Sequence, residues 1–165
     1  MNIRWPASAK SFGADDTGAI LVEFGIVMPL MLLFLSLTVE SARMMWSYQS
    51  AIAGVRDAGR YLARVTPATI CSTGGSVSAL APKLKAIVEE DINGNAIFPS
   101  PITVNSVTPT VTCVAGSYRV NPAPVGNVSA NLTIQFPMGG VLDLFGDAIS
   151  STTTTISDSS RIFGQ

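Results

Sequence analysis

The sequence predicts an α+β fold in which one long amino-terminal helix precedes a small helix and an antiparallel sheet. An apolar run at residues 19–39 contains a single charge, and the helical spacing of apolar residues continues beyond it. A second amphipathic segment follows. Beyond Phe98 the chain changes to β-branched segments separated by turn residues. Helices and strands that occupy separate parts of a chain are typical of α+β folds.

The apolar run is long enough to cross a membrane. Its 21 residues would span roughly 30 Å as a helix, which is the thickness of the hydrocarbon core. Glu23 is its only charge, and Pro29 lies inside it, where membrane helices tolerate proline. A secretory signal cut near Ala42 is the competing interpretation. The long polar lead and the internal glutamate are atypical of such signals.

The helical period does not stop at the end of the apolar run. One stripe at steps of three and four comprises Met45, Tyr48, Ile52, Val55, Gly59 and Leu62. We therefore expect one helix over residues 19–64, about 70 Å long. Because this exceeds the membrane thickness, its second half must lie in water and pack on the remainder of the chain.

The rest of the chain predicts one further helix and several strands. Pro67 closes the first helix, residues 71–76 are expected as a loop, and residues 77–92 have the period of a second helix. Pro82 makes the start of that helix uncertain. Strands are expected at 102–107, 110–115, 128–136 and 150–157, with turns at Pro109, 115–117, 121–127 and 137–140.

Composition restricts the classes of function. Apolar residues make up 47% of the 165 residues and charged residues 13%, and the mean hydropathy is +0.41, which favours membrane association. A net charge of −1 offers no basic surface for nucleic acid. The absence of histidine removes the commonest general base and the commonest metal ligand, so we expect no enzyme, no cofactor and no metal site.

The two cysteines and one acidic cluster have structural explanations. Cys71 and Cys113 lack the paired spacing of a zinc site. They would form a disulfide if this part of the chain lies outside the cytoplasm, and two buried free thiols are the alternative. The acidic residues 89–91 are interpreted as a solvated helix end rather than a metal site.

A small constellation at the start of the apolar run carries the functional information. Gly18 is followed by Ala19, and then by Glu23 and Phe24. This arrangement resembles the leader of type IV pilin-like proteins, in which a prepilin peptidase would cut after Gly18. The new ammonium of Ala19 would lie one helical turn from the Glu23 carboxylate. The charge of Glu23 could therefore be neutralised by the amino terminus of its own chain or by that of a neighbouring subunit. In the alternative, Gly18 is an ordinary flexible residue and Glu23 lies near the membrane interface.

Over residues 18–64 the sequence resembles the TadE family, pseudopilins of the tight adherence (Tad, or Flp) pilus system. The shared features are Gly18 with Glu23–Phe24, Pro29, Glu40, Arg43 and the segment AGRYLA at 58–63. The departures are Ser41 and Ala42, where the family commonly has an aromatic residue and a glycine, and the reversed order of Ala58 and Gly59. None of them touches the expected cleavage site.

The resemblance implies a minor pilin-like subunit (pseudopilin) that supports pilus assembly and adherence. Residues 1–18 would be a cytoplasmic leader, residues 19–64 the long helix, transmembrane to about 39, and residues 65–165 an extracytoplasmic α+β domain. The implied partners are the prepilin peptidase, other Tad or Flp pilins and pseudopilins, and the Tad assembly platform of the bacterial inner membrane. The basic residues flanking the span do not decide its orientation, so the orientation rests on the resemblance.

A second class of function stays open at this stage. The chain could be an unprocessed, membrane-anchored binding module whose extracytoplasmic part meets a surface partner. Cleavage at Gly18 separates the two hypotheses.

Overall fold

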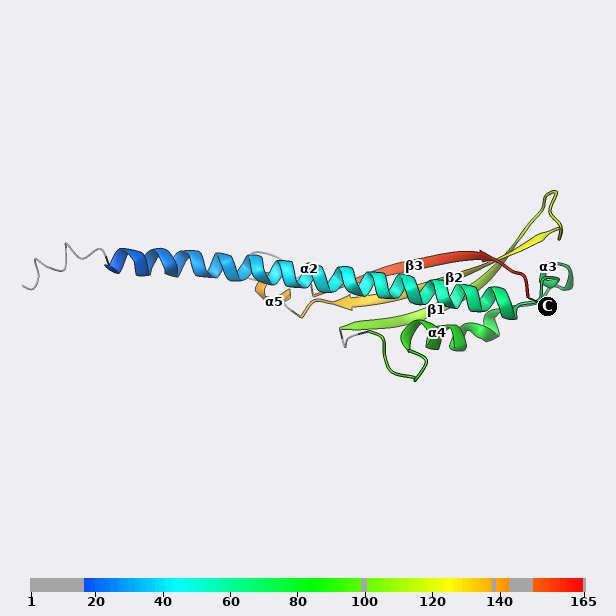
Figure 1. Cartoon of the computed structure of the whole chain (residues 1–165), viewed down its shortest axis with the longest axis horizontal. Helices are drawn as coiled ribbons and strands as arrows, with labels where there is room; N and C mark the ends of the chain where they lie inside the picture. The colour runs from blue at the N-terminus through cyan, green and yellow to red at the C-terminus, as the bar shows by residue number, and fades with distance from the viewer. Residues whose placement is uncertain (1–16, 99–100, 138, 143–149, 165) are drawn as a thin grey trace, which may run out of the picture. The chain divides into compact units, whose positions relative to one another are not determined.

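The computed structural model describes residues 17–98, 101–137, 139–142 and 150–164, and the expected leader before Thr17 lies outside these residues. The elements in chain order are α2 (Thr17–Val65), α3 (Ile70–Thr73), the 3-10 helix η2 (Ser78–Leu80), α4 (Ala81–Glu89), β1 (Ile102–Val114), β2 (Ala123–Gln135), α5 (Gly139–Leu142) and β3 (Ser151–Arg161) (Figure 1). The predicted α+β class is confirmed: a long apolar helix precedes a small helix and a three-stranded antiparallel sheet.

The long helix belongs to two compact units. The boundary falls between Val39 and Glu40, so residues 40–65 of α2 form one unit with the rest of the chain. The predicted helix 19–64 is confirmed, with one further residue at its carboxyl end and two at its amino end. Pro29 lies within it without ending it.

The sheet has the order β1-β2-β3, and both pairs are antiparallel. The predicted turn at Pro109 is wrong, because β1 continues through it and Pro109 pairs with Val128. A proline fits an edge strand wherever its missing N–H would face away from the neighbouring strand. The pairing of β1 with β2 shifts register between Val104 and Ser106, which marks a bulge.

Three other boundaries differ from the prediction. Strand β2 begins at Ala123, inside the segment expected as a turn, because its alternating residues are already buried there. The second helix is shorter than expected, since Pro82 lies in the first turn of α4 and the helix ends at Glu89. Ile92, predicted to be on its apolar face, is instead fully exposed. Helix α3 occupies the start of the segment expected as a loop.

Residues 40–65 of α2 and helix α4 cover one face of the sheet. The shared core comprises Ala51, Val55, Ala58, Leu62, Leu84, Val88, Val104, Val107, Val128, Ala130, Leu132 and Ile156. At the side of β3, the Ser160 hydroxyl donates to the Gly59 carbonyl over 3.0 Å, and the hydroxyls of Tyr48 and Thr154 lie 3.0 Å apart. The residue numbers increase in the same direction along both elements, so this part of α2 runs parallel to β3.

Small side chains let α2 approach its neighbours closely. A Cβ at Gly54 would lie 3.1 Å from the Val88 carbonyl oxygen of α4. The predicted stripe is confirmed in its second part, where Val55, Gly59 and Leu62 are buried. Its first part is wrong: Met45 is 62% exposed, and the small residues Ser47 and Ala51 are buried instead.

The other face of the sheet carries mainly uncharged polar side chains. The Asn105 amide donates to the side-chain oxygens of Asn131 and Thr133, at 2.7 and 2.8 Å, and the Asn131 amide donates to Thr155 over 3.2 Å. The hydroxyls of Thr133 and Thr153 lie 3.2 Å apart. Cross-strand hydrogen bonds of this kind stabilise the sheet from its solvated side.

The end of α2 is held by residues that follow β3. The backbone N–H groups of Phe163 and Gly164 both donate to the Ala63 carbonyl at 3.1 Å, and Ala68 N–H donates to the Gly164 carbonyl at 3.0 Å. The last carbonyls of a helix lack partners within the helix. This contact supplies two donors to the Ala63 carbonyl, and it leaves no room for a side chain at Gly164 beside the Thr66 carbonyl.

Candidate functional site

The expected cleavage site lies in the first turn of α2. Gly18 and Ala19 are both exposed and helical, and a Cβ at Gly18 would meet no described atom within 4 Å beyond its chain neighbours and its own helical backbone. The bond between them is thus unobstructed by the described residues. Its cleavage stays a prediction.

Glu23 and Phe24 are exposed on the same helix. Glu23 lies four residues after Ala19, one helical turn away, and has no ion-pair partner among the described residues. Phe24 is 62% exposed. The structure therefore brings Ala19 and Glu23 to one side of α2, and it leaves both free to meet a neighbouring molecule.

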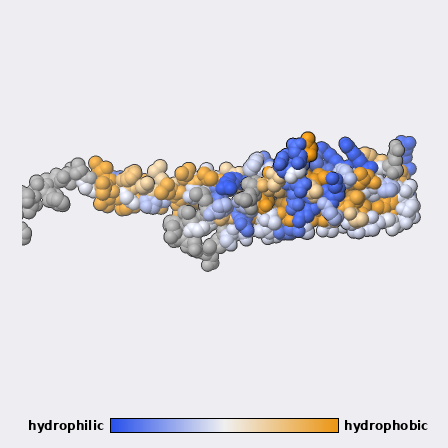
Figure 2. Space-filling model, turned by 90° about the horizontal axis from the view of Figure 1, so that it is seen from below, coloured by the Kyte–Doolittle hydropathy of each residue, from blue (hydrophilic) through white to orange (hydrophobic). Residues whose placement is uncertain are grey.

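The segment of α2 that carries these residues is apolar on all sides. Its exposed large side chains include Ile20, Leu21, Val22, Phe24, Ile26, Met31, Leu32, Phe34 and Leu35. Figure 2 shows the hydrophobic colouring over this first part of the helix. By its length and composition, the helix could cross a membrane once. A helix that is apolar all round requires an apolar environment, which a bilayer or a bundle of similar helices supplies.

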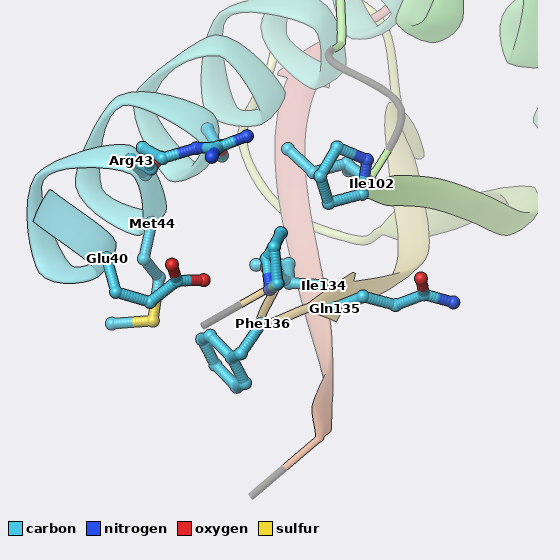
Figure 3. A pocket seen from close by; sticks show the side chains of 10 residues that line it. Glu40, Arg43, Met44, Ile102, Ile134, Gln135 and Phe136 are labelled. Carbon is cyan, nitrogen blue, oxygen red and sulfur yellow. The ribbon is translucent and has the colours of Figure 1, made fainter. Parts of the chain in front are cut away.

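A second glutamate of α2, Glu40, lies in a contrasting environment. It is the first residue of the second compact unit and is only 9% exposed, with its carboxylate directed toward Ile134 and Phe136 (Figure 3). Its Oε2 atom is buried and has no hydrogen-bond partner among the described residues. An unpaired buried carboxylate is costly, so such a group needs a compensating partner or function.

The pocket around Glu40 is small. Its walls come from α2, from the start of β1 and from the end of β2, and are formed by Glu40, Arg43, Met44, Ser47, Pro101, Ile102, Ile134, Gln135, Phe136 and Pro137. The free volume of about 10 Å³ has room for about one water molecule. Arg43 lies one turn beyond Glu40 but makes no ion pair with it within 4 Å. This pocket suits a single water molecule or donor group rather than a substrate.

The sequence analysis used Glu40 only as part of a family resemblance and did not predict its burial. A signal was present in the spacing. Ala51, Ser47 and Glu40 lie 11, 15 and 22 positions before Leu62, close to whole numbers of helical turns, and all of them are buried. Apolarity alone could not identify this face, because two of these residues are polar.

Cys71 and Cys113 are bonded to each other, with an S–S distance of 1.99 Å and a Cα–Cα distance of 5.8 Å. The bond joins α3, which directly follows the end of α2, to the last part of β1. Both cysteines of the sequence are used, so neither is a free thiol. In the described part of the chain, no group of three or more acidic residues and cysteines is arranged to hold a metal ion.

Comparison with known families gives one match. Residues 18–60 match the family model of TadE-like proteins, which confirms the resemblance found in the sequence. The match covers Gly18, Glu23, Pro29 and Glu40, and it ends within the amphipathic half of α2. No curated protein and no solved structure matches the chain.

Proposed function

We propose that this chain is a minor pilin-like subunit of the Tad (Flp) pilus. The premise is that residues 18–60 match the family model of TadE-like proteins, which associates the chain with Tad pilus systems. A prepilin peptidase cuts it after Gly18, and the mature chain assembles through the apolar part of α2. The observation that carries the proposal is the position of Glu23. It is the one charge in an exposed apolar helix, four residues after the new amino terminus.

The chemistry of assembly follows from that position. Cleavage creates an ammonium at Ala19, and a helix places it one turn from the Glu23 carboxylate. A carboxylate alone in hydrocarbon costs several kcal/mol, so pairing with an ammonium of the same chain or of a neighbour lowers the free energy of the assembled state. When the ammonium belongs to a neighbour, only one stagger between the two helices forms the pair. In that arrangement Glu23 sets the register of assembly.

The proposed pilin-like function also implies a location and a set of partners. The chain spans the bacterial inner membrane once through residues 19–39, with the leader in the cytoplasm and residues 40–165 outside it. The disulfide is compatible with this orientation, since such bonds persist in oxidising compartments. Its partners are the prepilin peptidase, other Tad pilins and pseudopilins, and the assembly platform. Its contribution to adherence comes through the pilus.

The alternative is a membrane-anchored binding module that is never processed. The sheet face of asparagine, serine and threonine residues favours it, because an extended uncharged polar surface offers many donors and acceptors to a partner. This alternative requires an intact leader. Processing therefore separates the two functions.

The first experiment is the amino-terminal sequence and intact mass of the protein from native membranes, with and without an active prepilin peptidase. The proposal expects a chain that begins at Ala19 with the peptidase and at Met1 without it. A Gly18→Leu variant should keep its leader in both strains. A full-length chain in both strains would establish the unprocessed anchor instead, and a start near Ala42 would identify a cleaved secretory signal.

A second experiment tests the role of Glu23. Glu23→Ala should be processed and inserted normally but lose its place in the pilus fraction, because its register pair is gone. Glu89→Ala, which removes a glutamate of α4 that does not line the groove beside α4, is the matched control. Wild-type incorporation of Glu23→Ala would refute the register role.

A further inference from the structure

A groove lies between the second half of α2 and the turn that follows α4. Its volume is about 810 Å³, and its walls are Ser50, Ala53, Gly54, Asp57, Lys83, Ala86, Ile87, Glu90, Asp91, Ile92, Gly94 and Ile97. The α2 side consists of small residues, and the opposite side carries three isoleucines. Three acidic residues and one lysine make the groove acidic in balance. It is thus suited to an amphipathic, basic element.

One wall of the groove presents an isoleucine to solvent on a rigid turn. Ile92 is 101% exposed, and the Asp91 carboxylate beside it accepts the backbone N–H groups of Asn93 and Asn95 at 2.8 and 2.9 Å. The Asn95 amide adds a third bond at 3.1 Å, and Gly94 has the positive φ of 81° that the turn requires. A large apolar side chain held this firmly in water is typical of a contact residue at an interface.

The complementary element is on the same chain. Arg56, Arg60 and Arg64 follow one another at four-residue intervals on the solvent side of α2, and all three are exposed. Arg60 pairs only with the exposed Asp57 of its own helix, at 3.3 Å, a contact of small energy that leaves the guanidinium accessible. This basic face, defined by the three arginines, has no other ion-pair partner among the described residues.

We infer that the groove of one copy receives the basic face of α2 from a second copy of this chain. The charges are complementary, because the basic face would lie against Glu90 and Asp91. The small residues Ser50 and Ala53 on the α2 wall allow a second helix to approach closely. Ile92 would pack beside the aliphatic stems of the arginines. The inference rests on the proposed function, since two anchored copies must point the same way out of one membrane.

The positions of the two surfaces define the kind of assembly. On α2 the groove is centred near Ala53 and the basic face on Arg60, seven residues apart, which is roughly 10 Å along a helix. Parallel copies would therefore be staggered by about that distance. Because the copy whose groove is filled keeps a free basic face, and its partner keeps a free groove, the contact is heterologous and can propagate. A twofold dimer that kept the two α2 helices parallel would, by contrast, have no stagger along them.

The test places a photo-reactive phenylalanine at position 92 of the full chain in native membranes, with two differently tagged copies expressed together. We expect an adduct between the two tags, which peptide mass mapping locates to residues 56–64. The same residue at position 118, where Tyr118 is 49% exposed, is the matched control and should give no such adduct. An adduct only with a different protein, or none, overturns the inference.

Charge reversal tests the same contact independently. The variant Arg60→Glu with Arg64→Glu should lower the adduct yield at least roughly tenfold, and adding Glu90→Arg should restore part of it. Arg119→Glu with Arg161→Glu makes the same change in net charge on other exposed arginines and should leave the yield unchanged. An unchanged yield in the first variant overturns the inference.

Cleavage after Gly18 is measured in the same samples, so the proposed function and the contact between copies can be refuted independently. A chain that begins at Ala19 but gives no adduct refutes the contact between copies and leaves the pilin-like function standing. A chain with an intact leader refutes the proposed function, whatever the adduct.

Discussion

The two parts of α2 on either side of Glu40 use the same backbone for opposite purposes. Up to Val39 the helix exposes large apolar residues on every side, and its one charge is exposed. From Glu40 onward it is amphipathic: it buries small residues against the sheet, exposes arginines and buries a carboxylate. The difference teaches that one helix can combine two kinds of surface. The apolar part is defined by its composition, whereas the amphipathic part is defined by what packs on it.

The largest expected effect comes from removing a buried side chain of the second part. Leu62 is fully buried, so Leu62→Ala should lower the free energy of unfolding of residues 40–165 by about 2–5 kcal/mol. Leu32→Ala makes the same truncation in the apolar part, where the side chain is 51% exposed, and should leave that free energy unchanged. Chemical unfolding of the full chain in detergent measures both. Equal losses would mean that the two parts are packed alike.

The disulfide sharpens the comparison, since only the second unit is cross-linked. Replacing both Cys71 and Cys113 with serine opens a link between positions 42 residues apart. The free energy of unfolding should fall by about 2–4 kcal/mol, because the unfolded chain gains freedom. Helical circular dichroism from the membrane part should persist after the sheet has unfolded. A variant as stable as the wild type would show that packing alone holds α3 to β1.

The two glutamates of α2 should differ in the property that their replacement changes, and the expected effect on stability is smaller. Glu40→Leu removes a buried carboxylate oxygen without a partner and should raise the free energy of unfolding by about 1 kcal/mol. Glu23→Leu should leave the folding of the second unit unchanged and impair pilus incorporation instead. If Glu40→Leu lowers stability, the carboxylate has a partner that the described residues do not include.

The smallest effect is a pH dependence confined to the second unit. Hydrogen bonds from the Asn95 backbone, the Asn95 side chain and the Asn93 backbone hold the pKa of Asp91 below its ordinary value of 3.8. The turn should therefore keep its full stability above pH 3.8 and lose it as the pH falls through the lowered pKa of the folded state. The amide resonances of Asn93 and Asn95 report this in NMR spectra. In Asp91→Asn the transition should be absent, and a transition at the ordinary pKa would contradict the assignment.

Much of this architecture could be predicted from the sequence because it depends on local pattern. The apolar run, its continuation to Arg64 and the change to β-branched segments are periodicities of neighbouring residues. The errors arose where tertiary contacts override local preference. Pro109 lies within a strand because β1 is at the edge of the sheet, and Ile92 is exposed because α4 ends at Glu89 and a turn capped by Asp91 follows.

The candidate site divides in the same way. Gly18, Ala19, Glu23 and Phe24 could be found in the sequence, because a motif of adjacent residues defines them and their significance is chemical. Glu40 could not be recognised as buried. Its environment is made by Ile134 and Phe136, more than ninety positions away. The groove beside Ile92 also depends on residues from two helices and a turn.

By itself, the sequence determined that this protein has a membrane-length apolar helix, a TadE-like amino-terminal segment and an α+β remainder, because each is a local pattern of residue types. Only the tertiary structure decided which face of α2 is buried, which edge of the sheet carries a proline, that Cys71 meets Cys113, and where a groove faces solvent. These depend on contacts between residues far apart in the chain. Their energies are set by packing and desolvation rather than by the preferences of single residues.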